Sequence, residues 1–154
     1  MSRALPLITM LFSTAALVLC GASPTWAALG EPADSIAADL QAMRGELKTA
    51  AGDSYSWHQI TAPDGTVVRE YVSPAGLVFG VAWQGPTHPN LELLLGSHFK
   101  ELAGAAQSET RRHQPFALRS DDLVIEIGGH MRAFHGRAYL PRLLPDAVSA
   151  SEVR

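Results

Sequence analysis

The residues most capable of chemistry are two histidines in the segment "GGHMRAFHG", residues 128–136. Imidazoles bind metal ions and move protons near neutral pH, so such a pair suggests a metal or catalytic site. His130 and His135 are five positions apart, however, and residues five apart on one regular strand point to opposite faces of a sheet. They could converge only if His130 lies in the turn or if Gly136 marks a β-bulge. We therefore predict no metal site and no catalytic pair in this segment.

Other histidines, arginines and aromatic residues could form a binding surface. Arg132 and Arg137 could bind an anionic group, and the aromatic side chains could bind a sugar or a peptide if several of them share one face. His88 lies in the loop "GPTHPN", and loops carry binding residues more often than the core does. The predicted binding residues are His88, His130, Arg132, His135, Trp57 and Tyr71.

Two alternatives to a partner-binding role remain open. A histidine-dependent hydrolase or metal-binding protein would use these histidines with Asp121 or Glu126. A small-ligand binder would use a cleft along the small residues Gly80 and Ala82. The chain has no His-Glu-x-x-His motif, no Gly-x-Ser-x-Gly motif and no phosphate-binding or dinucleotide-binding glycine loop. We therefore predict no catalytic residue, no metal and no cofactor.

The N-terminal segment predicts export. Arg3 precedes a mostly apolar run over residues 5–20, which is followed by a Ser-Pro pair and by small residues. This pattern is typical of a secretory signal peptide over residues 1–27, with cleavage between Ala27 and Ala28. A membrane span needs roughly 20 apolar residues, whereas this run is shorter and contains polar residues. We predict a periplasmic or secreted protein with no stable membrane span after cleavage.

Composition limits the partners of the mature chain. Residues 1–27 contain one of the 12 basic residues, Arg3, and none of the 15 acidic ones, so the mature chain has 11 basic and 15 acidic residues and a net charge of −4. Nucleic-acid binders need a clustered basic face, so we predict no nucleic-acid partner. The single cysteine, Cys20, lies in the predicted leader, which leaves the mature chain without a disulfide.

The elements that position these residues form an α+β pattern. We predict one domain over residues 28–145 and a flexible tail over residues 146–154. Helices are expected over residues 34–50 and 91–105, and strands over residues 55–61, 66–72, 77–85, 121–127 and 131–140. The expected fold is an antiparallel sheet of about five strands, in the order α-βββ-α-ββ, with two helices packed on one face.

Short-range features predict the connections. The segments "APDG" (62–65) and "SPAG" (73–76) share the form x-Pro-x-Gly, in which proline presets φ and glycine accepts the left-handed conformation of a tight hairpin loop. Asn90 is expected to cap the second helix. Gly128 and Gly129 are expected to form the turn between the last two strands.

The strand over residues 77–85 is expected at the centre of the sheet. Simple alternation places Leu77, Phe79, Val81 and Trp83 on the core face, and Val78, Gly80 and Ala82 on the other face. The small residues of the second set would let a helix or a neighbouring chain approach closely.

Three segments of the chain resemble a known family. They are "ALGEP", "GTVVREYVSPAGLVFGVAWQGPTHPNLELLLG" and "GGHMRAFHGRAYLP", and the resemblance covers nearly all of residues 28–145. The family is a bacterial exported one of unknown function, the 2844 family. The resemblance implies export and a single compact domain in the bacterial envelope, but it supplies no activity, cofactor or functional residue.

The leading hypothesis is a non-enzymatic binding or assembly accessory protein of the envelope. The chain is small and carries no catalytic motif. Its sheet is expected to have open edges, which can accept an added strand. The expected partner is another exported or envelope protein.

Overall fold

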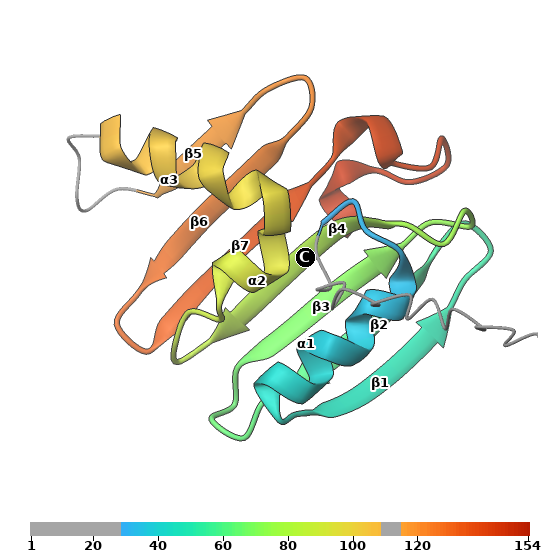
Figure 1. Ribbon diagram of the computed structural model, residues 1–154, viewed down its shortest axis with the longest axis horizontal. Coiled ribbons are helices and arrows are strands. Elements are labelled where there is room, and N and C mark those ends of the chain that lie inside the picture. The colour runs from blue at the N-terminus through green and yellow to red at the C-terminus, as the bar shows by residue number, and fades with distance from the viewer. Residues whose placement is uncertain (1–28, 109–114) are drawn as a thin grey trace, which may run out of the picture.

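The computed structural model describes residues 29–108 and 115–154, which form one antiparallel sheet with helices on one side (Figure 1). The predicted leader and the pair Ala27–Ala28 lie outside these residues. The strands are β1 (Glu46–Ala51), β2 (Ser56–Thr61), β3 (Val67–Val72), β4 (Val78–Gly85), β5 (Phe116–Arg119), β6 (Val124–His130) and β7 (Ala133–Tyr139). The helices are α1 (Ile36–Met43), α2 (Leu91–Leu95) and α3 (Phe99–Ser108), with short 3-10 turns at Ala33–Ser35, Gly96–His98, Pro141–Leu143 and Ala150–Glu152.

The sheet has seven strands in the order β1-β2-β3-β4-β7-β6-β5, so the prediction of about five strands is wrong. One additional strand is β1, which replaces the end of the first predicted helix. The helix ends at Met43 because Arg44 takes a left-handed conformation, with φ of 50°. A Cβ at Gly45 would lie 2.7 Å from both Ile60 Cγ2 and Thr61 O, so only glycine permits this close approach. Leu47, expected on the helix, instead pairs with Ile60 in the sheet.

The other additional strand, β5, lies between the second predicted helix and the strand predicted over residues 121–127, where no element was predicted. Phe116 and Leu118 are half-buried whereas Ala117 and Arg119 are exposed, which is the alternation of a strand covered on one face. The strand is only four residues long and pairs with β6. So short a segment carries a weak periodic pattern, and the pairing with β6 decides its conformation.

Several local predictions are confirmed. Gly65 and Gly76 have φ of 89° and 78° in the two hairpin loops. The side chain of Asn90 accepts a hydrogen bond from Leu93 N at 3.2 Å, as expected of a helix cap. The second predicted helix, by contrast, is not continuous. It is interrupted at Gly96, whose non-helical backbone, with φ of 52° and ψ of −123°, ends α2 before α3 begins.

All three helices cover the same face of the sheet, which we call the helix face (Figure 1). Side chains from α1, α2 and α3 pack there against the central strands in one apolar core. The buried members of this core include Ile36, Leu94, Leu95, Leu102, Ile60, Val68, Val81, Trp83, Ile125 and Ala138. The α+β class is therefore confirmed, whereas the predicted sheet of about five strands in the order α-βββ-α-ββ is wrong, because four strands follow α1 and three follow α3.

The opposite face, which we call the outer face, is partly covered by residues 141–154, the C-terminal segment. Val148 and Val153 are buried against Tyr71, Phe79 and Ala82 in a second apolar cluster. This packing differs from the flexible tail predicted over residues 146–154. A long sequence distance separates the tail from the strands that it covers, so no local pattern could reveal the contact.

Gly80 makes room for this segment. A Cβ at Gly80 would lie 3.0 Å from Val153 Cγ2 and 3.2 Å from Val153 Cγ1. Gly80 does permit a close approach, but the segment that approaches is the protein's own C-terminal segment and not a helix or a neighbouring chain. At Gly80, Val153 therefore fills the cleft that was expected along Gly80 and Ala82.

A β-bulge in β4 overturns one detail of the predicted core. Tyr71 pairs with Gly80 and Val72 with Val78, which leaves Phe79 without a partner on β3. The extra residue turns Phe79 to the outer face, where it packs in the second cluster, while Val81 and Trp83 remain on the helix face. The prediction that Phe79 shares a face with Val81 and Trp83 is wrong, because simple alternation does not hold across a bulge.

Candidate functional site

The outer face carries charged side chains on β7, β6 and β5, beside Ala82 of β4. Ala82 pairs with Arg137, Arg137 with Glu126, and Glu126 with Ala117. Residues that are directly opposite in adjacent strands project from the same face, so these side chains lie side by side. The sequence placed Arg137 among residues that could bind an anion, but only the strand register brings it beside Glu126.

Glu126 is held by two arginines. Arg119 Nη2 lies 2.6 Å from Glu126 Oε1, and Arg137 donates to Glu126 Oε2 from Nε at 2.8 Å and from Nη2 at 2.7 Å. The hydrogen bonds from Arg119 and then from Arg137 lower the pKa of the Glu126 carboxyl below its ordinary value. Glu126 is therefore an ionised structural acceptor with both oxygens engaged, which makes it a poor general base.

Arg137 also fastens the C-terminal segment to the sheet. Its Nη1 donates to Ala150 O at 3.0 Å and to Val153 O at 3.4 Å. Further along the same face, Tyr71 Oη donates to the main-chain oxygen of Arg154 at 2.6 Å, and Arg69 Nη1 donates to the same oxygen at 3.1 Å. The segment thereby forms one wall of a groove that runs over β4, β7, β6 and β5.

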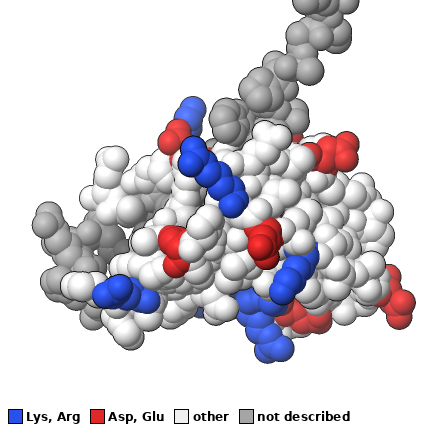
Figure 2. All heavy atoms as spheres, turned by 90° about the horizontal axis from the view of Figure 1, so that it is seen from below, with Lys and Arg blue, Asp and Glu red and all other residues white. Residues whose placement is uncertain are grey.

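This groove, which we call the arginine groove, has a volume of about 600 Å³, within the range of ligand-binding cavities. Side chains of three arginines and one glutamate line it, which gives it a formal charge of +2 on a chain whose net charge is −3. The residues that line it are Trp83, Gln84, Pro115, Phe116, Ala117, Arg119, Glu126, Ile127, Gly128, His135, Gly136, Arg137 and Arg154. The groove is thus a local concentration of positive charge. In the view of Figure 2, by contrast, basic and acidic side chains are interspersed.

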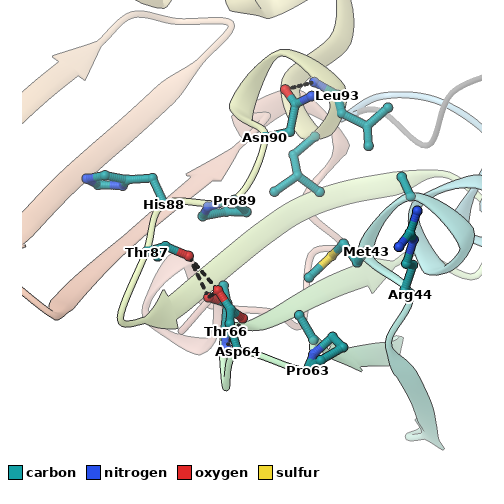
Figure 3. Close-up of a pocket in the computed structure, with 13 residues that line it drawn as sticks. Met43, Arg44, Pro63, Asp64, Thr66, Thr87, His88, Pro89, Asn90 and Leu93 are labelled. Atoms are coloured by element: carbon teal, nitrogen blue, oxygen red, sulfur yellow. Dashed lines mark hydrogen bonds between the residues drawn. The ribbon is translucent and has the colours of Figure 1, made fainter.

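A second cavity of about 410 Å³ lies between the end of α1, the β2–β3 turn and the β4–α2 loop (Figure 3). Asp64 organises its polar side: it accepts from Thr66 N at 2.8 Å, Thr66 Oγ1 at 3.0 Å and Thr87 Oγ1 at 2.7 Å. These bonds, the one from Thr87 foremost, lower the pKa of Asp64. Because protein donors already satisfy the carboxylate, this network mainly joins the turn to the loop.

The three histidines of the predicted site have different surroundings. His88 turns away from the other labelled side chains in Figure 3, and its ring packs on Phe134 with centroids 4.2 Å apart. His135 lies over Gly128 on the outer face and lines the arginine groove. Phe134 and His135 are successive residues of β7, so His88 and His135 lie on opposite sides of the sheet.

His130 lies beside the turn between β6 and β7. That turn is formed by Met131 and Arg132, since His130 pairs with Ala133 and Arg132 has φ of 66°. The predicted turn at Gly128 and Gly129 is wrong, because both glycines belong to β6. The two histidines therefore sit on two different strands, rather than on one strand as the first interpretation assumed. Within residues 29–108 and 115–154, no three His, Cys, Asp or Glu side chains are grouped to hold a metal ion.

The remaining predicted binding residues are also separated. Arg132 lines a shallow hollow of about 420 Å³ with His135. Trp57 is half-buried on the outer face, with the Arg69 guanidinium 5.0 Å from its ring centroid. Tyr71 is 1% exposed, and its hydroxyl group binds Arg154, so packing already uses its ring and its polar end. The prediction that these six residues bind a ligand stays a prediction.

Sequence reasoning missed a buried carboxyl pair. Asp39 of α1 and Glu70 of β3 are 0% and 1% exposed, and their carboxyl groups interact electrostatically in the core of the helix face, where no hydrogen-bond partner reaches Asp39 Oδ1, Asp39 Oδ2 or Glu70 Oε2. Two carboxyl groups buried in this way cannot both be charged, so at least one keeps its proton. Burial is the largest cause of the raised pKa values, about 6 for Asp39 and about 9 for Glu70.

A pattern in the sequence could have revealed this pair. Glu70 stands two residues from both Val68 and Val72, on the buried face of β3, and Asp39 lies three residues after Ile36 on the buried face of α1. No described pocket reaches either carboxyl. The pair therefore belongs to the stability of the fold and contributes no surface to the arginine groove.

These features define an α+β domain built on one antiparallel sheet, with a charged groove on its outer face. None of the helices that the structure describes is both long and apolar enough to cross a bilayer. A family model described as a protein of unknown function, DUF2844, matches residues 25–153, so the chain belongs to this family. No curated protein and no solved structure matches the chain. The resemblance seen in the sequence is confirmed, and any function must come from the geometry.

Proposed function

We propose that this protein is an exported, non-enzymatic binding protein of the bacterial envelope. Its partner is another exported protein, which presents an acidic segment to the arginine groove. The observation that carries the proposal is the convergence of Arg119, Arg137 and Arg154 on one groove that contains a single acidic side chain.

The groove suits an extended acidic segment better than a compact ligand. It runs across four strands and is open to solvent on the outer face, so a chain can lie along it. Arg137 is already committed to Glu126 and to the C-terminal segment. Arg119 also bonds to Glu126, through Nη2. Its side chain and that of Arg154 are nevertheless exposed and can reach a partner's carboxylates, as guanidinium groups commonly do.

The same contacts favour binding over catalysis. Glu126, the carboxylate nearest to His135 along the groove, is neutralised by two arginines, and its lowered pKa opposes proton transfer near neutral pH. The hydrolase alternative would need Glu126 or another carboxylate to be free beside an imidazole.

We expect the purified mature protein to bind a fluorescent oligoglutamate peptide, with an affinity that falls as salt rises. Replacing Arg119 and Arg154 by glutamine should weaken binding about tenfold, since two exposed charges contribute together about 1.4 kcal/mol. Fluorescence anisotropy at low and high salt measures both effects. An oligolysine peptide and inorganic phosphate serve as comparison ligands.

The matched control is R44Q/R142Q, which removes the same charge from exposed positions outside the groove. It should leave the affinity unchanged. Equal weakening in both double variants would mean that only overall charge matters, and absence of binding to oligoglutamate would remove the basis of the proposal. Equal competition by phosphate would point to a small anion as the ligand instead of a protein segment.

Export would place this protein in the same compartment as its exported partner. In cells that carry the full-length gene, we expect the mature protein to begin at Ala28, because Thr25 and Ala27 provide the small residues that signal peptidase requires. Mass spectrometry of the envelope fraction measures the N-terminus. Replacing Ala27 by a bulky residue such as leucine should leave the uncleaved precursor, whereas Ala28→Leu should not prevent cleavage. A mature N-terminus elsewhere would contradict the predicted position.

A further inference from the structure

The edge strand β1 is open along its whole length. It forms one end of the sheet and pairs only with β2, through six consecutive residue pairs from Glu46↔Thr61 to Ala51↔Ser56. Five of its six residues are exposed, and Leu47, at 42% exposure, is one of the two exposed large apolar side chains in the described part of the chain. A straight, regular edge of this length offers a row of unpaired backbone groups.

The strand lacks the usual protection on its helix face. Leu47, Thr49 and Ala51 share that face, and none of them is charged or a proline. The register with β2 is continuous, so no bulge twists the edge away. Natural sheets prevent edge pairing with charged side chains, lysine above all, and with prolines or bulges. The two charged residues of β1, Glu46 and Lys48, lie on its other face. By comparison, the opposite edge, β5, has only four residues.

We propose that β1 pairs with β1 of a second copy of this chain, antiparallel and across a two-fold axis perpendicular to the sheet. Such an axis keeps the helix faces of both copies on the same side, so each residue pairs with one an even number of positions away. The residue on the axis then lies opposite the same residue of the second copy. Lys48 or Thr49 on the axis would pair five residues of each strand, whereas Leu47 or Ala50 would pair only three.

Charge and backbone conformation select among these registers. Lys48 on the axis would place two ammonium groups directly opposite each other, which is destabilising. Leu47 on the axis would require Arg44, which has a left-handed conformation, to continue the strand. Thr49 on the axis pairs Leu47 with Ala51 and Lys48 with Ala50 of the second copy, with no like charges opposed.

This register also covers the exposed leucine. Leu47 of each copy would lie against Ala51 of the other on the helix face, and the small alanine side chain leaves room for it. The resulting dimer continues the sheet through both copies. The arginine groove lies over β4, β7, β6 and β5, at the other end of the sheet, so it stays accessible and the dimer does not depend on the proposed function.

Charged substitutions of Thr49 test the axis directly. We expect the wild-type protein to reach a monomer–dimer equilibrium in sedimentation velocity, with the dimer favoured at high concentration. Thr49→Lys and Thr49→Glu each place like charges opposite each other and should give monomers. Mixed in equal amounts, the two variants should form a heterodimer. Thr49 is exposed and both variants lose the same bond to His58, so circular dichroism should show an unchanged fold.

The control Ala117→Lys places the same charge on the exposed surface of the other edge strand and should leave the dimer intact. A wild-type protein that is monomeric at every concentration would overturn the proposal. A dimer that survives both Thr49 substitutions would place the interface elsewhere, and failure of the mixed variants to associate would exclude the axis at Thr49. None of these outcomes bears on peptide binding in the arginine groove.

Discussion

The free energy of unfolding is expected to fall steadily as pH rises from neutrality toward 9, because of the buried pair of Asp39 and Glu70. Burial raises the pKa of Glu70 from its ordinary 4.5 to about 9 and that of Asp39 from 3.8 to about 6. In the unfolded chain both groups ionise freely at low pH. Folding above that pH therefore requires the folded state to keep a proton that the unfolded state releases.

These pKa values determine the direction of the stability change and the pH range over which it occurs. A carboxyl with a raised pKa in the folded state contributes full stability below its unfolded pKa and loses it as pH rises through its folded pKa. For Glu70 the loss extends from about 4.5 to about 9, and for Asp39 from about 3.8 to about 6. Above pH 7 only Glu70 contributes, with a slope of at most about 1.4 kcal/mol per pH unit.

One neighbouring group acts in the opposite direction at lower pH. His58 is the cross-strand partner of Glu70 on β2, and burial lowers its pKa below 6.5. It therefore costs stability as pH falls below 6.5, since the unfolded imidazole takes up a proton more readily. The partner of Glu70 on β4 is Val81, which does not titrate. Measurements above pH 7 separate the carboxyl pair from His58.

Glu70→Gln tests this account. The glutamine amide keeps the shape of the protonated acid and can donate to Asp39, but it cannot ionise. We expect its unfolding free energy, measured by urea titration between pH 7 and 9, to be nearly independent of pH while that of the wild type falls. The control Glu92→Gln, at an exposed position on α2, should follow the wild type. Parallel slopes for Glu70→Gln and wild type would show that Glu70 does not hold its proton.

Gly136→Ala is expected to be among the most destabilising single-methyl changes in the protein. A Cβ at Gly136 would lie 2.3 Å from Cζ2 and 2.6 Å from Cε2 of Trp83, and 2.9 Å from Glu126 O. Trp83 is 3% exposed and packed in the helix-face core, so its ring cannot move aside without disturbing its neighbours. Overpacking of this kind costs about 3 kcal/mol, which lowers the Tm by about 10 °C.

Gly104→Ala provides the matched control. It adds the same methyl group in α3, where no atom lies within 4 Å of the new Cβ. We expect it to raise stability by about 1 kcal/mol, because alanine favours the helix over glycine. A second comparison combines Gly136→Ala with Trp83→Leu, which should cost less than the two single changes added together. Equal Tm values for Gly136→Ala and Gly104→Ala would contradict the tight contact with Trp83.

The contrast between these two glycines illustrates how far the sequence could predict the fold. Local chemistry was sufficient for the hairpin loops at Gly65 and Gly76 and for the cap at Asn90, because their conformations depend on a few adjacent residues. The sequence alone could not show that Gly136 accommodates an indole ring from another strand. The packing of Trp83 over Gly136 depends on the pairing of β4 with β7.

The candidate site depended even more on long-range contacts. Arg137 and Glu126 were both noted from the sequence, but for different roles, and their ion pair arises from the register of β6 with β7. With the turn at residues 131–132 rather than at the two glycines, His130 and His135 lie on adjacent strands, and because Gly128 pairs with His135 they project from the same face of the sheet. A shift of three residues in one turn thus changed which side chains are neighbours.

By itself, the sequence determined the α+β class, five of the strands, the tight turns and the family, because short-range conformational preferences and hydrophobic periodicity are written in neighbouring residues. Only the tertiary structure decided the two edge strands, the bulge at Phe79, the buried pair of Asp39 and Glu70, and the docking of Val153 onto Gly80. Each of these features forms between segments that are distant in the chain. Their stability comes from pairing and burial, which depend on which surfaces meet, and no local pattern encodes that choice.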